Sequence, residues 1–230
     1  MKNVQLTLLL VLMLMLWTNV DAQSLKVFKK DGTTIVVPYA ELDSIVAVAE
    51  EETKVEAVDL GLPSGLKWAT CNLGATTPEG YGDFYAWGEI NTKDEYTVAN
   101  SETTGVKMKD YSGDAKYDVA RAILGGTWRT PTKAEMQELL DNCIWTWTEQ
   151  NETVGMLVTG PNGSSIFFPT PGCRMGKKQL YEGQNSYYWS STPDENNNDY
   201  AFYLTFNCYD FHDVTYYYRD FGMNIRPVGE

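Results

Sequence analysis

The chain has 230 residues, a formal net charge of -13 and a pI of about 4.5. Nucleic-acid-binding domains carry basic patches, and anionic membrane surfaces attract basic segments, so this acidity argues against both partners. The length allows one substantial hydrophobic core, alone or with a small added module.

The N-terminus has the pattern of a secretory signal peptide. Lys2 supplies a positive charge, and residues 6–17 are apolar apart from Thr7. Val20-Asp21-Ala22 then offers small residues where a signal peptidase reads, which predicts cleavage before Gln23. The alternative is a membrane anchor, but the run is shorter than the roughly 20 apolar residues that cross a bilayer. We therefore expect residues 1–22 to be a signal peptide, with no membrane span after cleavage. The final compartment would be the periplasm, the outer surface or the extracellular space.

Residues 23–49 predict a small β module. The segments 25–30 and 33–37 are expected to form a hairpin around Asp31-Gly32, a strong two-residue turn sequence. A helical turn over 39–43 and a strand over 44–48 would follow. The charged stretch 50–57 is the best linker candidate, which leaves 58–230 as the main domain.

Two helices are predicted in the first half of that domain. Asp114 is expected to cap a helix over 117–124, which Gly125-Gly126 would end. Thr132 and Glu135 have the spacing of a capping box at the start of a second helix, with apolar residues continuing to Leu140.

Strands dominate the second half. Gly and Asn clusters separate predicted strands at 154–158, 165–168, 187–190, 200–207 and 213–218. Helices followed by a run of mainly antiparallel strands are typical of an α+β domain.

Five ordered motifs give the domain a specific resemblance. They are the segments 58–75 (VDLGLPSGLKWATCNLGA), 81–89 (YGDFYAWGE), 126–132 (GTWRTPT), 188–191 (YWSS) and 225–228 (IRPV). Together they resemble the FISUMP-type major paralogous domain of exported proteins from Gram-negative bacteria. The resemblance implies a C-type-lectin-like fold, shared in outline with formylglycine-generating enzymes and with retroelement-diversified receptors. It implies surface binding or adhesion rather than a defined reaction. The segments KVFKKDG (26–32) and ELDSIV (41–46) resemble a module that precedes such domains.

The residues inside these motifs also have a structural interpretation. Trp68, Trp87, Trp128 and Trp189 stand beside Gly or other small residues, a pattern that favours core and loop packing over ligand stacking. Arg129 and Arg226 are each followed by or close to proline, and we expect them to be structural hydrogen-bond donors.

The four cysteines suggest disulfides in an exported protein. The resemblance makes Cys71 and Cys143 neighbours, and Cys173 and Cys208 flank late strands and would pair with each other. Four cysteines allow three connectivities, and four free thiols remain an alternative. Metal binding is not expected, because the chain has one histidine and no C-x-x-C pair.

Sequence motifs of the common hydrolases and of phosphate-binding loops are absent. The single histidine, His212, is expected on an exposed loop. A carboxylate pair for glycoside hydrolysis depends on three-dimensional separation, so an exported glycan-active enzyme stays open as an alternative function. Calcium binding through Asp194, Glu195 and Asp199 is a further alternative to ordinary solvated turns. We expect no cofactor and no catalytic residue.

The span 196–222 is the predicted binding face, for a glycan or protein ligand at the cell surface. It is rich in Tyr, Phe and Asn, the chemistry of adaptable binding surfaces. Alternation of Phe202, Leu204 and Phe206 with Tyr203 and Thr205 predicts a strand with one buried face. The residues expected to contact ligand are Asn196, Asn197, Asn198, Tyr209, Asp210, His212, Asp213, Tyr216, Tyr217, Tyr218 and Arg219.

The same span contains no Glu, Lys, Gln, Met or Trp. Codons that end in a pyrimidine cannot encode these residues. Adenine-directed mutagenesis of Asn codons gives this restricted set in the retroelement-diversified receptors. The span is therefore either diversified in that way or selected as a binding surface, unless strands and turns simply disfavour these residues. The codons of the gene decide between these interpretations.

Overall fold

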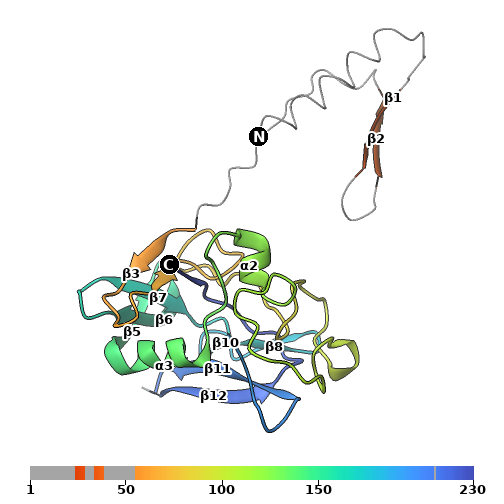
Figure 1. Ribbon diagram of the computed structural model, residues 1–230. Coiled ribbons are helices and arrows are strands. Elements are labelled where there is room, and N and C mark those ends of the chain that lie inside the picture. Colours follow the sequence, from red (N-terminus) through yellow and green to blue (C-terminus); the bar gives the residue numbers. More distant parts are fainter. Residues whose placement is uncertain (1–23, 29–33, 39–54, 210) are drawn as a thin grey trace. The chain divides into compact units, whose positions relative to one another are not determined.

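The structure is a computed structural model that describes residues 24–28, 34–38, 55–209 and 211–230 (Figure 1). The chain separates into two compact units, residues 1–52 and 53–230. The expected signal peptide, the Asp31-Gly32 turn and the elements expected over 39–48 lie outside the described residues. In the described part of the chain, no helix is long and apolar enough to cross a membrane.

The first unit contains the expected hairpin. Strands β1 (Ser24–Phe28) and β2 (Thr34–Pro38) pair in antiparallel fashion from Ser24 opposite Pro38 to Phe28 opposite Thr34. In the second unit, Thr70 donates its backbone N–H to the Glu56 carbonyl, so ordered pairing begins before the expected boundary at residue 58.

The second unit is an α+β domain rich in antiparallel strands. Its described residues contain two α-helices, α2 (Val119–Leu124) and α3 (Lys133–Asn142), and a short 3-10 helix, η2 (Val98–Asn100). The strands are β3 (Ala57–Asp59), β4 (Lys67–Ala69), β5 (Ile144–Gln150), β6 (Thr153–Thr159), β7 (Ser165–Pro169), β8 (Cys173–Met175), β9 (Lys178–Leu180), β10 (Asn185–Pro193), β11 (Tyr200–Asn207), β12 (His212–Tyr218) and β13 (Val228–Gly229).

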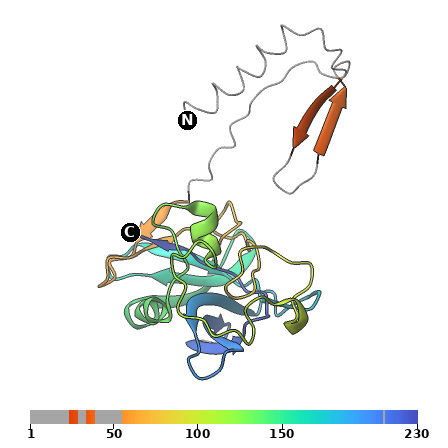
Figure 2. The same cartoon turned by 45° about the vertical axis from the view of Figure 1, so that its right-hand side comes forward.

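These strands form sheets in the orders β13-β4-β3, β5-β6-β7, β8-β9 and β10-β11-β12. Every ladder pairs antiparallel strands. Helix α3 contacts β10, β11 and β12, and Figure 1 shows it lying along that sheet. Figure 2 shows the β11–β12 hairpin (blue) at the bottom of the domain.

Both helices begin at side-chain caps. Thr132 and Glu135 form the expected capping box of α3, in which each side chain accepts a hydrogen bond from the other residue's backbone N–H. Asp118, rather than Asp114, caps α2 and accepts from the N–H groups of Ala120 and Arg121. The prediction of Asp114 was wrong because that residue forms the preceding turn, where its carboxylate accepts from Lys116.

The sheet β10-β11-β12 separates two hydrophobic clusters. Leu204 and Phe206 are fully buried in a cluster with α3 and the β5-β6-β7 sheet. On the other side, Tyr203 is 8% exposed and packs in a cluster that contains Trp87 and Trp189. The expectation that β11 buries one face was therefore wrong, because both faces of this strand are covered.

The five motifs of the sequence meet in one hydrogen-bonded unit, which we call the interlocked scaffold (segments 58–75, 81–89, 126–132, 188–191 and 225–228). Val228 pairs with Trp68 and also forms a bridge with Arg129. Trp87 donates its indole N–H to the Ser190 carbonyl at 2.8 Å. Trp189 donates to the Tyr85 carbonyl at 3.0 Å. Segments far apart in the sequence therefore hold one another in place.

The tryptophans and arginines of the interlocked scaffold are structural, as expected. Trp68, Trp87 and Trp189 are fully buried, and Trp128 is half-buried against Gly229. Arg129 donates two hydrogen bonds to the Glu135 carboxylate. Arg226 is fully buried above the Phe168 ring, and it donates to the Asn72 side chain and to the carbonyls of Ala69, Thr70 and Phe167.

Candidate binding surface

Strand β12 lies at one edge of the β10-β11-β12 sheet as the structure describes it, and it carries most of the exposed aromatic residues of the predicted binding face. Even-numbered residues face α3, because Val214 lies in the cluster beneath that helix. Tyr216 and Tyr218 follow on the same face, opposite Phe202 and Tyr200. The sheet thus presents these two tyrosines beside the helix.

Exposure decides whether these side chains are free to bind. Tyr209 is 87% exposed, Phe211 and Tyr216 are each 50% exposed, and Tyr218 is 41% exposed. These four residues form what we call the aromatic strip. Burial of Tyr209, Tyr216 and Tyr217 in the core would have excluded the predicted face, and the structure leaves all three exposed.

Two tyrosines of the strip, Tyr216 and Tyr218, contact other rings. Tyr200 contacts Tyr218 with ring centroids 4.7 Å apart and Tyr216 at 5.6 Å. The hydrogen bond with Tyr218 raises the pKa of Tyr200 to about 12. Lys133, from the first turn of α3, places its ammonium 3.6 Å from the Phe202 ring centroid. This cation borders the strip beside Tyr216.

The other end of the strip is the β11–β12 turn. Asn207 shapes it by accepting the Tyr209 N–H on its side-chain oxygen and by donating its own N–H to the Phe211 carbonyl. Tyr209 consequently stands at the tip of the turn. Asp210 lies outside the described residues.

His212 begins β12 rather than lying on a loop, which corrects the expectation. It is exposed, yet its ring stacks on Trp145 with centroids 5.7 Å apart and planes 7° from parallel. The adjacent Asp213 is exposed and points to the opposite face of the strand. Of the two, His212 is the one that continues the aromatic strip.

Tyr217 also belongs to the opposite face. It is 41% exposed, and it contacts Tyr203 and Phe221 with centroid separations of 6.4 Å and 4.8 Å. Tyr217 therefore lies on the other face from Tyr216, although its ring still contacts that of Tyr218 with centroids 5.4 Å apart.

Arg219 is not part of the surface, and its assignment as a ligand-contacting residue was wrong. Its side chain is fully buried over the Trp87 ring, 4.2 Å from the centroid. It donates to the carbonyls of Tyr200, Thr103 and Val106. Burial lowers the pKa of Arg219 to about 10, which still leaves it charged at neutral pH. Its role is to fix the end of β12 to the loop before α2.

The Asn-rich loop between β10 and β11 lies at the Tyr218 end of the hairpin, opposite the turn that carries Tyr209. Asn196 and Asn198 are exposed, whereas the Asn197 side chain accepts the N–H of Asp199 within the loop. Because β11 and β12 are antiparallel, the predicted residues form an elongated surface along the hairpin rather than one pocket.

Comparison with known families adds one result. The family model described as the Lcl C-terminal domain matches residues 60–229. The chain belongs to this family. Searches of the curated proteins and of the solved structures gave no match. The Lcl C-terminal domain is associated with exported proteins, and membership indicates a secreted or surface-associated domain.

The cysteines of this Lcl-type domain do not form the expected bridges. All four, each within the described residues, are free thiols. Cys173 is buried in the cluster beneath β8, whereas Cys208 is exposed at the β11–β12 turn. Cys143 ends α3 and packs against the other cluster.

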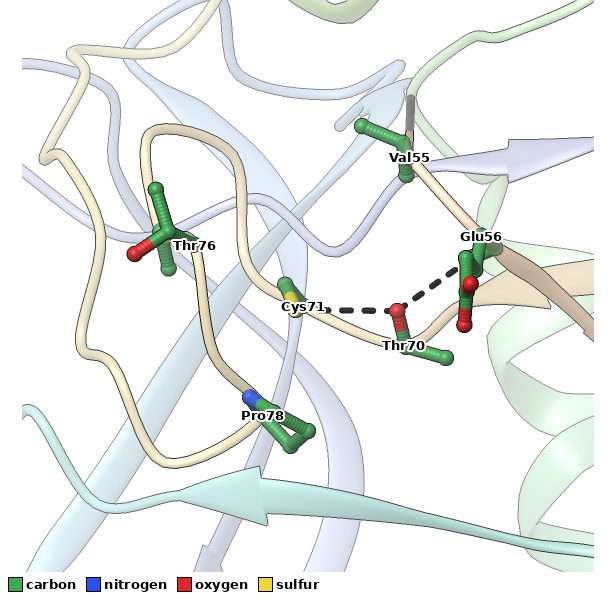
Figure 3. Close-up of a pocket in the computed structure, with 7 residues that line it drawn as sticks. Val55, Glu56, Thr70, Cys71, Thr76 and Pro78 are labelled. Atoms are coloured by element: carbon green, nitrogen blue, oxygen red, sulfur yellow. Dashed lines mark hydrogen bonds between the residues drawn. The ribbon is translucent and has the colours of Figure 1, made fainter. Parts of the chain in front are cut away.

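Cys71 lies in a surface cavity of about 400 Å³ (Figure 3). The Thr70 hydroxyl lies 3.6 Å from the Cys71 sulfur and donates to the Glu56 carbonyl at 3.4 Å. The polar groups of this cavity therefore bond to one another. The remaining lining residues are Val55, Ala75, Thr76 and Pro78.

Of the acidic residues considered for calcium, the Asp194 carboxylate is used in a local turn. Asp194 accepts the Asn196 N–H, and the Asp199 carbonyl accepts the Arg219 N–H. Among the described residues, no group of three or more His, Cys, Asp or Glu side chains is arranged to hold a metal ion.

Sequence reasoning missed a second aromatic group on the opposite face of the sheet. Tyr181 and Tyr187 precede the predicted span, yet they join Tyr203, Tyr217 and Phe221 around one pocket. The density of Tyr between 181 and 188 was the available signal, but the contact depends on the β8-β9 hairpin packing against the sheet.

Proposed function

We propose that this protein is an exported, non-catalytic binding or adhesion module that recognises a surface glycan or protein ligand through the aromatic strip. This proposal rests on the exposure of the four residues of the strip, Tyr209, Phe211, Tyr216 and Tyr218. They belong to the β11–β12 hairpin, which is anchored in the two hydrophobic clusters. Tyrosine offers a large contact area at low entropy cost, and a rigid strand reduces that cost further.

The chemistry of two thiols, Cys143 and Cys173, supports a non-catalytic role. Burial raises the pKa of Cys173 to about 11, and burial together with Glu138 raises that of Cys143 to about 11. These thiols stay protonated at neutral pH and are poor nucleophiles. His212, the only histidine, stacks on the Trp145 ring.

We also infer that the domain is a FISUMP-type member with a C-type-lectin-like fold. The five motifs that carry this resemblance coincide with the interlocked scaffold, and the α+β composition agrees with it. Superposition of an experimental structure on C-type-lectin-like domains tests this inference; a different strand order in the sheet that contains β10, β11 and β12 would reject it.

The binding proposal is tested on glycan and surface-protein arrays with the purified exported protein. We expect specific spots to retain the wild type and to lose at least about tenfold in signal with the triple variant Tyr209→Ser, Tyr216→Ser, Tyr218→Ser, because hot-spot aromatics carry most binding energy. Ile123→Ser, a change at a 58% exposed residue of α2, is the control for lost surface hydrophobicity.

Product analysis of the same wells separates binding from catalysis. Retention without product release supports the module. Cleaved glycan in wild-type wells would instead identify the alternative, an exported glycan-active enzyme. Unchanged retention of the triple variant would move the binding surface elsewhere on the domain.

A further inference from the structure

The opposite face of the β10-β11-β12 sheet contains a pocket of about 250 Å³ that the aromatic strip does not use. It lies between the β8-β9 hairpin, the sheet and the segment after β12. The lining residues are Cys173, Met175, Leu180, Tyr181, Tyr187, Tyr203, Tyr217, Phe221 and Met223.

The pocket has a buried floor and an open rim. Cys173, Tyr203 and Met223 are 3%, 8% and 1% exposed and form the floor. Met175 and Tyr181 are 48% and 52% exposed and form the rim together with Tyr217. A ligand therefore enters from solvent and ends against sulfur atoms and an aromatic ring.

Five aromatic rings follow one another around this space. Successive centroids are 6.2 Å, 5.7 Å, 6.4 Å and 4.8 Å apart in the order Tyr181, Tyr187, Tyr203, Tyr217 and Phe221. The ring planes of Tyr203 and Tyr217 lie at 73° to each other, and those of Tyr217 and Phe221 at 83°. The rings around this space therefore differ in plane.

The electrostatic surroundings favour positive charge. The described residues that line the pocket include no Asp, Glu, Lys, Arg or His. Burial raises the pKa of Tyr203, and Tyr187, Tyr217, Cys173 and the carboxylate of Asp213 raise it further. Of these groups, the Asp213 carboxylate carries a negative charge near the pocket, and the protein as a whole carries a net charge of -13.

We propose that this pocket binds a quaternary ammonium group of the trimethylammonium type. Aromatic faces attract a cation through their quadrupoles, and methyl groups fill the space between rings and thioethers. A primary ammonium is more strongly hydrated and would lose its water without a carboxylate in the lining to replace it. This goes beyond the proposed function, because the pocket and the strip face opposite sides of the sheet.

Titration of the exported protein with choline, followed by the NMR signals of Tyr and Met side chains, tests the proposal. The probe for charge is 3,3-dimethyl-1-butanol, in which a carbon atom replaces the nitrogen of choline. We expect choline to bind about tenfold more tightly than this neutral isostere. Equal affinity would show an ordinary apolar pocket, and absence of choline binding up to high millimolar concentration would also overturn the proposal.

Variants locate the binding. Tyr217→Leu and Tyr181→Leu each remove one ring, and both are expected to lower choline affinity severalfold while circular dichroism shows a folded domain. The matched control is Ile144→Leu, at a residue that is 71% exposed at the start of β5. Unchanged choline affinity in both tyrosine variants would reject the pocket as the site.

A separate experiment identifies the source of the trimethylammonium group. Cosedimentation with phosphatidylcholine vesicles, compared with phosphatidylglycerol vesicles, reports a lipid headgroup. Binding of free choline with no preference for either vesicle reports a soluble ligand. Array binding by the aromatic strip is measured independently. A negative result for choline therefore leaves the proposed function untouched, and a negative array result leaves the pocket proposal untouched.

Discussion

The interlocked scaffold and the aromatic strip use the same residue types in opposite ways. In the scaffold, Trp87 and Arg226 are buried, and their polar groups bond to carbonyls from distant segments. In the strip, Tyr209 and Tyr216 are exposed; Tyr209 lies in a turn, and Tyr216 contacts two neighbouring rings. Substitutions in the scaffold should therefore change stability, whereas substitutions in the strip should change recognition.

The sharpest test of this contrast is Arg226→Met. The change leaves three carbonyl oxygens and the Asn72 side-chain oxygen without their donor in a fully buried site. We expect the free energy of unfolding to fall by about 3–5 kcal/mol, measured by urea denaturation. Tyr209→Ser in the strip should change it by no more than about 0.5 kcal/mol. Similar losses in both variants would remove the distinction between the regions.

A pair of glycines in the β8-β9 region gives the next largest effect. Both have positive φ, but a Cβ at Gly172 would lie 1.9 Å from the Leu180 carbonyl oxygen, whereas Gly176 has open space. Gly176→Ala should cost about 1 kcal/mol from backbone strain alone. Gly172→Ala should cost about 3 kcal/mol, because overpacking adds to the strain. Equal losses of stability in the two variants, measured by thermal unfolding, would show that the β8-β9 hairpin shifts to accommodate the added methyl group at Gly172.

The smallest effect is the pH dependence of the Arg129–Glu135 pair. Burial alone would raise the pKa of Glu135, but hydrogen bonds from Arg129 and Thr132 outweigh it and lower the pKa below its ordinary value. A lowered folded-state pKa stabilises the fold above the unfolded-state pKa, and this contribution is lost as pH falls through the folded-state pKa.

Wild type should therefore exceed Glu135→Gln by about 1 kcal/mol in free energy of unfolding at pH 7, with the difference shrinking over roughly pH 5 to 3. Glu149→Gln, at an exposed position of β5, is the control and should show no such trend. A difference that stays constant with pH would contradict the ionic origin.

Local signals explain what the sequence predicted well. The capping box of Thr132 and Glu135 marks the start of α3 without any tertiary contact. Strand β11 occupies 200–207 as predicted, because β-favouring residues fill it and turn sequences bound it. The exposure of Tyr209 was also predictable, since this residue lies in a short turn between two strands.

Non-local contacts explain what was missed. Arg219 follows a run of exposed tyrosines in sequence, but its burial depends on carbonyls more than a hundred residues away. The side of the sheet that Tyr217 faces depends on the packing of β8, which spacing within β12 does not reveal. Strands β3, β4 and β13 are only two or three residues long, so pairing between the domain's two ends defines them more than their composition does.

The bond between the Asp213 carboxylate and the Val214 N–H, at 2.8 Å, has a consequence for the solubility of an exported protein. In the ladder with β11, odd-numbered residues of β12 direct their backbone groups inward, so the Val214 N–H points to the outer edge. Near the other end, the Tyr218 carbonyl accepts the Phe221 N–H. The chain thus occupies hydrogen-bonding groups at both ends of the edge and adds a negative charge there. Fewer backbone groups of β12 are free to pair with a strand of another molecule. The edge therefore opposes polymerisation through this tyrosine-rich strand.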